Sequence, residues 1–473
     1  MLHDACDVES LGVLCGFRSA FYDCLTARSD ALFELADAVL CAEGPVKTLV
    51  GLSLAPEHRR GHGALYDAVN HGRIDLERLR VALSRLPLPR WADGRLVLAV
   101  DVTPWLRPDA NTSDARSFCH TYGRGNDQAQ MIPGWPYSIV AALEPGRTSW
   151  TATLDAQRLA PGVDVAALTA TQVRDVVGRL LDVGQQPPTA PDILIVLDAG
   201  YDVPRIAFLL KDLPVQVLGR MRSDRVLCRP APARVPGTTG RPPKHGGEFV
   251  FADPATWGEP DAATTTDTQR YGTVHAQAFD RLHPTLTRRA AWREHTGALP
   301  VIEGTVIRLQ VDRLPHGGEA KPLWLWYSGT GTTPAGVDRL WQAFLRRFDL
   351  EHTFRLFKQT LGWTAPKLRD PASADRWTWI ILAVHTQLRL ARPMALDLRR
   401  PWEKPLPTHK LTPARVRRGF RHLRHKTGSP ASAPKPARPG PGRPPGSRNK
   451  THTPRHDVGR VLATGEAYQK PSH

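Results

Sequence analysis

The chain has 473 residues, of which 41% are hydrophobic, so it is long enough for two or three domains and a large core. Its six cysteines show no paired C-x-x-C spacing, which argues against a zinc module and a disulfide scaffold and predicts reduced thiols in a cytosolic protein. No apolar run approaches the ~18 residues of a membrane span and the N-terminus has no charged-then-apolar leader, so we expect a soluble intracellular protein without a membrane partner.

The positive charge is concentrated near the C-terminus. The formal net charge is +17 and the pI is near 10.0, which indicates a polyanion as partner. The segment from residue 401 onward holds sixteen Lys and Arg against three acidic residues, and so carries 13 of the 17 net positive charges. A basic tail on a nearly balanced body is less diagnostic than a uniformly basic protein, and a merely solvated tail is the alternative.

Residues 1–92 are predicted to be helical. Apolar residues recur at helical spacing over 17–42, and a second cluster over 46–86 is interrupted by the basic stretch 56–63. Short helices joined by a Gly-containing basic turn suit a helix-turn-helix DNA-binding unit, with Arg59, Arg60 and His62 near phosphate. An ordinary small helical domain is the equally good alternative.

Strand-like runs follow. They lie at residues 96–105, 137–143 and 148–154, the last two joined by a hairpin-type connection at 144–147, and then at 192–201 and 215–221. Helices are predicted at about 163–183 and 203–211. Adjacent strands followed by β-α-β crossovers imply an α/β fold, a mixed sheet with helices on its faces.

Two aspartates stand at strand ends. Asp101 closes the apolar part of the first run, and Asp198 ends the run at 192–201. Open α/β sheets keep their sites at the carboxyl ends of strands. Each aspartate alone would be better explained as the cap of a turn. Two such strands side by side would bring both carboxylates together.

Residues 222–332 are predicted to form a β-rich insertion. It contains the basic loop 241–247, with Arg241 and Lys244 as candidate DNA contacts, and strand-like runs at 248–251, 271–278, 301–311 and 322–327. Further on, residues 377–388 are apolar on nearly every side and predict a buried helix.

Between these segments, residues 344–363 predict one helix with two faces. Thr333-Pro334 supplies an N-cap and Gly362 a stop. At about 100° per residue, one stripe holds Phe344, Arg347, Glu351 and Lys358. A neighbouring stripe is apolar and core-facing. Without further context, an exposed helix with a simple Arg347–Glu351 ion pair is the better interpretation.

Asp101, Asp198 and Glu351 would form a carboxylate triad if this helix packs across the carboxylate-bearing edge of the sheet. Unit charges ~4 Å apart repel by ~4 kcal/mol at an effective dielectric of about 20, so such a cluster calls for a cation. Hard carboxylate oxygens select Mg²⁺ or Mn²⁺, and two such ions can drive phosphodiester chemistry. Arg347 and Lys358 would then hold the phosphates of the substrate.

These residues resemble the DDE transposases of bacterial insertion sequences, in the insertion-sequence-four-like group with its Tyr-(2)-Arg-(3)-Glu-(6)-Lys signature. The chain reads Phe344-(2)-Arg347-(3)-Glu351-(6)-Lys358, so three of four positions match, together with Asp101 and Asp198. The resemblance covers about residues 90–395. The departure is Phe344, which keeps an aromatic ring and lacks the hydroxyl.

The resemblance implies an RNase H-like catalytic domain in which Asp101, Asp198 and Glu351 bind the metal ions and perform catalysis. It implies that Arg347, Lys358 and the Phe344 position lie at the DNA. It also implies a transposase that binds terminal inverted repeats and target DNA as a homodimer, in the cytoplasm at the nucleoid. A non-catalytic DNA-binding remnant, and an RNase H-like nuclease without strand transfer, remain alternatives.

Six segments are therefore predicted. They are a helical DNA-binding domain (1–92), the first part of the catalytic domain (93–221), the insertion (222–332), a helical second part (333–395), a basic segment (396–427) and a disordered basic tail (428–473). The tail contains Gly442-Arg-Pro-Pro-Gly-Ser-Arg-Asn-Lys450, which resembles an AT-hook, with Arg443 and Arg448 as minor-groove contacts. A flexible charged linker is the alternative there.

Overall fold

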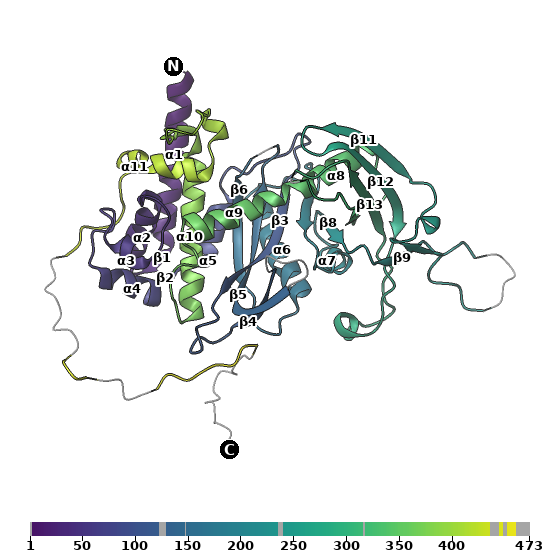
Figure 1. The fold of residues 1–473 in the computed structure, drawn as a ribbon, viewed down its shortest axis with the longest axis horizontal. Helices are drawn as coiled ribbons and strands as arrows, with labels where there is room; N and C mark the ends of the chain where they lie inside the picture. The colour runs from purple at the N-terminus through teal and green to yellow at the C-terminus, as the bar shows by residue number, and fades with distance from the viewer. Residues whose placement is uncertain are drawn as a thin grey trace.

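The computed structural model describes residues 2–122, 129–146, 148–234, 240–315, 317–435, 444–447 and 452–459. A helical body lies on one side, a mixed β-sheet crosses the centre, and further strands extend the sheet on the other side (Figure 1). This arrangement confirms the predicted fold class of an α/β protein with an RNase H-like mixed sheet and flanking helices.

Five strands form the centre of the sheet in the order β6-β5-β3-β7-β8. Their bounds are Val97–Leu106 for β3, Ala129–Leu143 for β5, Thr151–Arg158 for β6, Ile193–Leu197 for β7 and Val215–Met221 for β8. Strands β3, β7 and β8 are parallel, while β5 is antiparallel to β3 and to β6. A further strand, β4 (Ser117–Tyr122), pairs with the first part of β5 and was not predicted.

The two faces of this sheet bury different side chains. Leu98 and Val100 pack under α6 (Val165–Asp182) and α7 (Val203–Leu209). Val97 and Ala99 point to the opposite face, which carries α8 (Pro334–Arg346) and α9 (Phe348–Arg355). Both faces are covered, which is why these strands read as continuous apolar runs.

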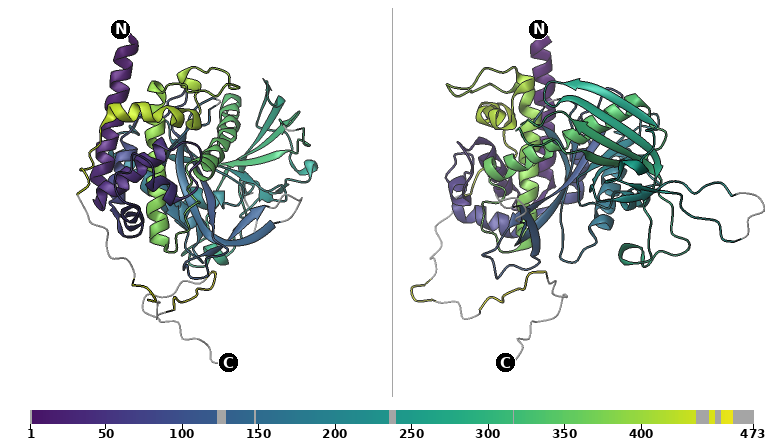
Figure 2. Two further views of the ribbon diagram at one scale, coloured as in Figure 1. Left: turned by 60° about the vertical axis from the view of Figure 1, so that its left-hand side comes forward. Right: turned by 45° about the vertical axis from the view of Figure 1, so that its right-hand side comes forward.

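The inserted residues continue the central sheet. Strand β14 (Leu323–Tyr327) pairs antiparallel with β8, and β13 (Gly304–Val311), β12 (Gly272–Leu282) and β11 (Ala262–Thr268) follow outward, as Figure 2 shows. Strands β9 (Val226–Cys228) and β10 (Glu248–Val250) form a separate hairpin. The insertion is β-rich as predicted. Strand β11 was missed because its Ala-Ala-Thr-Thr-Thr-Asp-Thr sequence is short of apolar residues.

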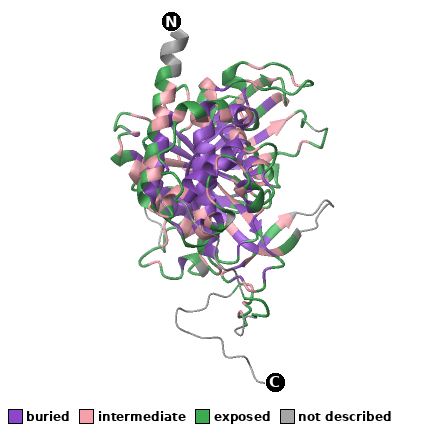
Figure 3. Cartoon of the chain, turned by 90° about the vertical axis from the view of Figure 1, so that its left-hand side faces the viewer, coloured by how far each residue is buried: buried purple, intermediate pink, exposed green. Residues whose placement is uncertain are grey.

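The helical body combines both ends of the chain. Its N-terminal helices are α1 (Leu2–Cys24), α2 (Ser29–Cys41), α3 (Leu49–Ser53), α4 (His62–His71) and α5 (Leu76–Ser84), and its C-terminal ones are α10 (Pro371–Ala391) and α11 (Pro413–Thr427). Helix α10 packs against α1, α2 and α4, and buried residues run through the middle of the molecule (Figure 3). The segment 1–92 therefore shares its core with α10 and α11.

Shorter elements join these parts. The strands β1 (Leu25–Ala27) and β2 (Arg73–Ile74) form a small antiparallel pair, and β1 divides the helix predicted over 17–42. Arg28, in the left-handed conformation with φ 59°, precedes α2. Single 3-10 turns lie at Pro254–Thr256, Ala290–Trp292, Arg392–Met394 and Thr408–Lys410. Over the described ranges, every helix is too short or too polar to cross a membrane.

The basic segment 396–427 is less free than its charge suggests. Four arginines of α11 pair with carboxylates. Arg415 pairs with Asp397 (2.9 Å) and Arg418 with Glu403 (2.7 Å) of the same segment, whereas Arg421 pairs with Glu57 (3.2 Å) and Arg424 with Asp37 (2.6 Å) of the N-terminal part. Much of the positive charge of α11 is thus neutralised within the chain.

Two stretches of the tail, which was predicted to be disordered, make hydrogen bonds to the body. The backbone N–H of Ser432 donates to Asp30 at 3.1 Å, and the N–H of His456 donates to the carbonyl of Asn111 at 2.9 Å. These contacts hold parts of 428–435 and 452–459 on the body. Sequence composition could not reveal them because each depends on a partner some 350 to 400 residues away. Arg443 and Arg448 of the AT-hook-like motif lie outside the described residues.

Candidate active site

Two neighbouring parallel strands carry Asp101 and Asp198. Val100 on β3 is in register with Leu197 at the end of β7, so the two following residues, both aspartates, stand side by side at the same edge. Side chains alternate along a strand, and this alternation turns both carboxylates toward the face that carries α8 and α9. The predicted convergence of the two strand ends is therefore present.

The helical stretch opposite them differs from the single helix predicted from the sequence. Helix α8 ends at Arg346, α9 spans Phe348–Arg355, and a π-helical turn, η3 (Leu356–Thr360), follows. In this turn the N–H of Leu361 donates to the carbonyl of Leu356, and Trp363 is buried beyond it. The wider turn moves Lys358 away from the stripe calculated for an ideal α-helix.

Gly362 ends the stretch as predicted, with φ +70°. A Cβ at this position would lie 2.5 Å from the carbonyl oxygen of Val46, so glycine is required both for the conformation and for the close approach. The N-cap is also confirmed, because the hydroxyl of Thr333 accepts the N–H of Gly336.

Arg347 lies at the centre of the three carboxylates. Its Nη1 donates to Asp101 Oδ2 at 3.0 Å, and its Nη2 lies 3.1 Å from Asp198 Oδ2 and 3.3 Å from Glu351 Oε1. The Arg347 side chain is only 3% exposed, whereas that of Glu351 is 50% exposed. Arg347 was predicted to hold a substrate phosphate; in this structure it holds the predicted triad instead.

Two aromatic rings flank the guanidinium. The Arg347 Cζ lies 5.8 Å from the ring centre of Phe344 and 4.9 Å from that of Phe348. Phe344 is 1% exposed, so its ring is part of the core, and its place at the DNA stays a prediction. Its role here is to support Arg347 from the buried side. Phe348, which sequence reasoning overlooked, covers the guanidinium from the solvent side.

Burial determines the protonation behaviour of the site. It raises the pKa of Asp101 to about 6, against the opposing effects of Arg347 and of the Val102 N–H, while Asp198 and Glu351 add to the rise. Burial also lowers the pKa of Lys358 to about 8. The Lys358 ammonium lies 5.8 Å from the ring centre of Trp363, and the negative charge of Asp101 acts to raise its pKa. Lys358 is thus beside the site as predicted, although half-buried.

Asp101, Asp198 and Glu351 are side chains of the type that binds a divalent cation, but they are not arranged around a common ion position. Asp198 Oδ1 is buried without a hydrogen-bond partner, as is the hydroxyl of Tyr201, and such orphaned oxygens are the kind that an ion or water satisfies. Within the described residues, however, no group of three or more His, Cys, Asp or Glu is placed to hold a metal ion. The ligands are present, and they are gathered around Arg347 rather than around one another.

Tyr201 was not singled out from the sequence, although it stands in the same turn as Asp198. Burial raises the pKa of its hydroxyl, and the charges of Asp101 and Asp198 raise it further. The group therefore stays protonated and keeps an unused hydrogen-bond donor near the two aspartates.

The other predicted DNA contacts lie elsewhere. Arg241 is exposed, and Lys244 donates to the carbonyl of Leu299 at 2.6 Å, in a loop at the end of the molecule away from α9 (Figure 1). The structure does not bring these two residues to the carboxylates.

Arg59 and Arg60 were predicted to lie near phosphate, and they are engaged inside the protein. Arg59 ion-pairs with the buried Glu34 at 2.7 Å, and Arg60 with Asp30 at 2.9 Å. Both also donate to the backbone carbonyl of Ser432. The buried carboxylate of Glu34 requires a cation, and this requirement explains why Arg59 forms an ion pair inside the protein.

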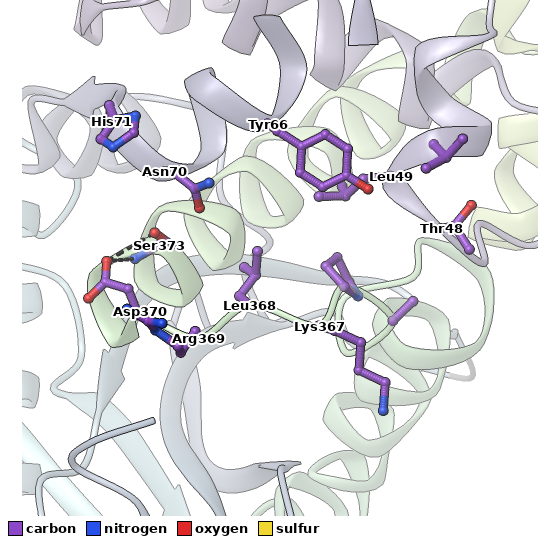
Figure 4. A pocket seen from close by; sticks show the side chains of 13 residues that line it. Thr48, Leu49, Tyr66, Asn70, His71, Lys367, Leu368, Arg369, Asp370 and Ser373 are labelled. Atoms are coloured by element: carbon purple, nitrogen blue, oxygen red, sulfur yellow. Dashed lines mark hydrogen bonds between the residues drawn. The ribbon is translucent and has the colours of Figure 1, made fainter. Parts of the chain in front are cut away.

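A groove of about 720 Å³ lies between the N-terminal helices and the loop that precedes α10. Tyr66 and Leu49 line one wall, and Lys367, Leu368 and Arg369 the other (Figure 4). Lys367 pairs with Asp109 at 3.1 Å, and Arg369 donates to Thr453 of the tail at 3.1 Å. The groove is distinct from the carboxylate cluster.

Comparison with known families gives one match. The model of the family described as DDE superfamily endonuclease matches residues 20–285, more than half of the chain. The match includes Asp101 and Asp198 and ends before Glu351. A search of curated proteins finds no match. The chain belongs to the DDE superfamily of endonucleases.

Proposed function

We propose that this DDE superfamily endonuclease is a transposase of the insertion-sequence type, which cuts DNA at the ends of its element and joins the freed 3′-hydroxyl to target DNA. Endonucleases of this superfamily act on DNA and generally use divalent metal ions. The observation that carries the proposal is the convergence of Asp101, Asp198 and Glu351 on a single guanidinium at the carboxyl edge of the sheet. The Arg-(3)-Glu-(6)-Lys spacing supports the same assignment.

In this proposal Asp101, Asp198 and Glu351 are the catalytic carboxylates that hold Mg²⁺ or Mn²⁺. When bound, such ions activate a water or a 3′-hydroxyl and stabilise the leaving oxygen of the phosphodiester. The chain's own groups provide the hard oxygen ligands, and the raised pKa of Asp101 means that a proton competes with a metal ion for this carboxylate at acidic pH.

The substrate phosphates are assigned to cations around α9. Lys358 lies beside the site on the buried side, and the exposed Arg355 lies on the outer side of the helix. Arg270, at the turn between β11 and β12, is close enough to His352 of α9 to influence its pKa. The β11–β12 hairpin is held over α8 by Thr264 and Thr266, whose hydroxyls donate to Asp338 at 2.8 and 3.0 Å. Both exposed arginines would meet a duplex that approaches Glu351.

Terminal inverted repeats as the binding sites, and a homodimer that brings two ends together, are part of the same proposal. They follow from the likeness of the catalytic residues to those of insertion-sequence transposases. Inverted repeats in the DNA that flanks the coding sequence, with short direct duplications outside them, would support this part.

The central test is Asp198→Asn. This change keeps the size of the side chain and removes its charge, so we expect it to abolish Mg²⁺- or Mn²⁺-dependent cleavage and joining of end-containing DNA while gel-shift binding persists. Asp202→Asn is a matched control, because Asp202 caps α7 four residues further along the chain. A variant Asp198→Asn that still cuts would remove the site assignment.

The two alternatives give different results in the same assay. Wild-type protein that shifts DNA without any nicking would be a non-catalytic binder. Protein that cuts end-containing DNA without joining it to a target would be a nuclease without strand transfer.

A further inference from the structure

The three carboxylates of the site share one cation that belongs to the protein. Arg347 contacts Asp101, Asp198 and Glu351 within 3.0 to 3.3 Å, and it is almost fully buried. A buried guanidinium is not held there by chance, because its desolvation has to be offset by ion pairs and hydrogen bonds. Among the described residues, Arg347 is the only cation paired with these three carboxylates.

The oxygens that Arg347 uses are the ones a metal ion would need. Asp101 Oδ1 already accepts the N–H of Val102 at 2.8 Å, so Oδ2, which faces Arg347, is the oxygen left for a ligand bond. A divalent ion ~4 Å from the guanidinium would be repelled by about 8 kcal/mol at an effective dielectric of about 20. Arg347 and a metal ion therefore exclude one another at this position.

The Arg347 side chain can move toward solvent on one side only. Phe344 closes the buried side, whereas Phe348 on the other side is 44% exposed. The Nε of Arg347 is buried without a partner, so the guanidinium has donor capacity that its present contacts do not use. A phosphodiester is a better partner for this planar group than any neutral acceptor, because it accepts two parallel N–H bonds.

We propose that Arg347 is an internal counter-ion that has to leave Asp101 and Asp198 before they bind a divalent cation, and that a DNA phosphate draws it out. This inference rests on the proposed function. DNA and metal ion then bind cooperatively, since each favours the arrangement in which Arg347 has left the carboxylates. The protein without DNA keeps its carboxylates neutralised and its hydrolytic centre unassembled.

The test measures Mn²⁺ binding rather than activity. Titration calorimetry at pH 7.5 would compare wild type, Arg347→Met and Arg346→Met, each alone and with a short DNA duplex of mixed sequence. Arg346 is the matched control: it is the adjacent residue with the same charge, and it contacts Gly146 and Asp349 instead of the triad.

We expect Arg347→Met to bind Mn²⁺ at least about tenfold more tightly than wild type without DNA, within the usual range of coupling between sites. Arg346→Met removes one positive charge near the site without removing a contact to the triad, so its Mn²⁺ affinity should differ from that of wild type by less than about threefold. The duplex should tighten Mn²⁺ binding to wild type by about tenfold and leave Arg347→Met unchanged.

Removal of Arg347 leaves three carboxylates without their cation, so folding has to be checked by thermal unfolding. If Arg347→Met does not fold, Arg347→Lys keeps one charge without the planar fork and should bind Mn²⁺ more tightly than wild type. The comparison of wild-type protein with and without the duplex does not depend on the folding of any variant.

Equal Mn²⁺ affinity of wild-type protein with and without the duplex would overturn the inference, as would equal gains in Arg347→Met and Arg346→Met. Absence of Mn²⁺ binding in every arm has a different meaning. It would overturn the metal assignment of the proposed function itself, and the exchange of Arg347 with it.

Discussion

The hydroxyls of Thr151 on β6 and Thr353 on α9 lie 2.9 Å apart, and both residues are fully buried. The Thr353 hydroxyl also donates to the carbonyl of Asp349 at 3.1 Å, so it accepts its second bond from Thr151. This contact joins the helix that carries Glu351 to the sheet that carries Asp101. It is a buried polar link between α9 and the strands.

Thr353→Val should cost about 1 to 3 kcal/mol of stability, because it leaves the buried Thr151 hydroxyl without an acceptor. Thr151→Val in the same background should restore part of that loss, since both polar partners are then gone. A double-mutant cycle from urea unfolding measures the coupling, which we expect to reach about 1 kcal/mol. Strictly additive effects would mean that the two hydroxyls do not depend on one another.

Phe344 and Phe348 flank the same guanidinium and differ in burial. Phe344→Ala should lower the free energy of unfolding by about 3 to 5 kcal/mol, because it opens a cavity in the core beside Arg347. Phe348→Ala removes a half-exposed ring and should cost less than about 1.5 kcal/mol. Chemical unfolding of the two variants decides the point. Similar losses would contradict the burial of Phe344 described above.

His385 on α10 makes stability sensitive to acid. Burial lowers its pKa to about 3, with Arg389 adding to the effect, and its ring lies between those of Trp150 and Phe357. The unfolded chain takes up a proton at this residue near pH 6.5, and the folded chain does not until about pH 3. Its contribution to stability is therefore complete above about pH 6.5 and is lost progressively as the pH falls, by about 1.4 kcal/mol per pH unit.

His385→Phe should accordingly flatten the dependence of unfolding free energy on pH between 6.5 and 4.5, by roughly 2 to 3 kcal/mol over that interval. His275→Phe, on the exposed side of β12, is the matched control and should leave the slope as it is in wild type. Urea unfolding at several pH values provides the measurement. A wild-type slope in His385→Phe would show that another group governs acid sensitivity.

DNA affinity should depend on free arginines and not on the paired ones of α11. Arg355→Gln removes an exposed cation beside Glu351, so the slope of log K against log salt should fall by about 0.9 for each phosphate that the variant no longer neutralises. Arg418→Gln removes a cation already paired with Glu403 at 2.7 Å and should leave the slope unchanged. Filter binding or anisotropy over a salt series distinguishes them. The reverse ranking would place the DNA on α11.

Much of the site could be predicted from local pattern alone. The two apolar runs that end in Asp101 and Asp198 are strands whose carboxyl ends meet, because burial on both faces leaves a clear signature in the sequence. The helical stretch with Glu351 begins at Thr333 and stops at Gly362 as capping chemistry indicates. Family membership then confirms the DDE endonuclease character of the chain, while the roles of individual residues stay predictions.

The failures concern charges whose partners are distant in the sequence. Helical spacing pairs Arg347 with Glu351, but it contains no information about Asp101, which lies 246 positions away and faces the same guanidinium. For the same reason α11 reads as a free basic segment, and Arg59 and Arg60 as phosphate contacts. The π turn after α9 was also not predicted, because the sequence from Leu356 to Thr360 has the same spacing of apolar residues as an ordinary α-helix.

Arg18 of α1 donates to Asp37 of α2 at 2.7 Å, to Gln387 of α10 at 2.6 Å and to the carbonyl of Gly428. One buried side chain thus connects the first helices with two segments that are translated more than 350 residues later. The native core of the first 92 residues cannot form while they emerge from the ribosome, because it also needs the side chains of α10. Residues 1–92 are equally unsuited to exchange between related chains, because a graft would have to include α10 and α11. What the N-terminal helices recognise is therefore inherited as a property of both ends of the chain.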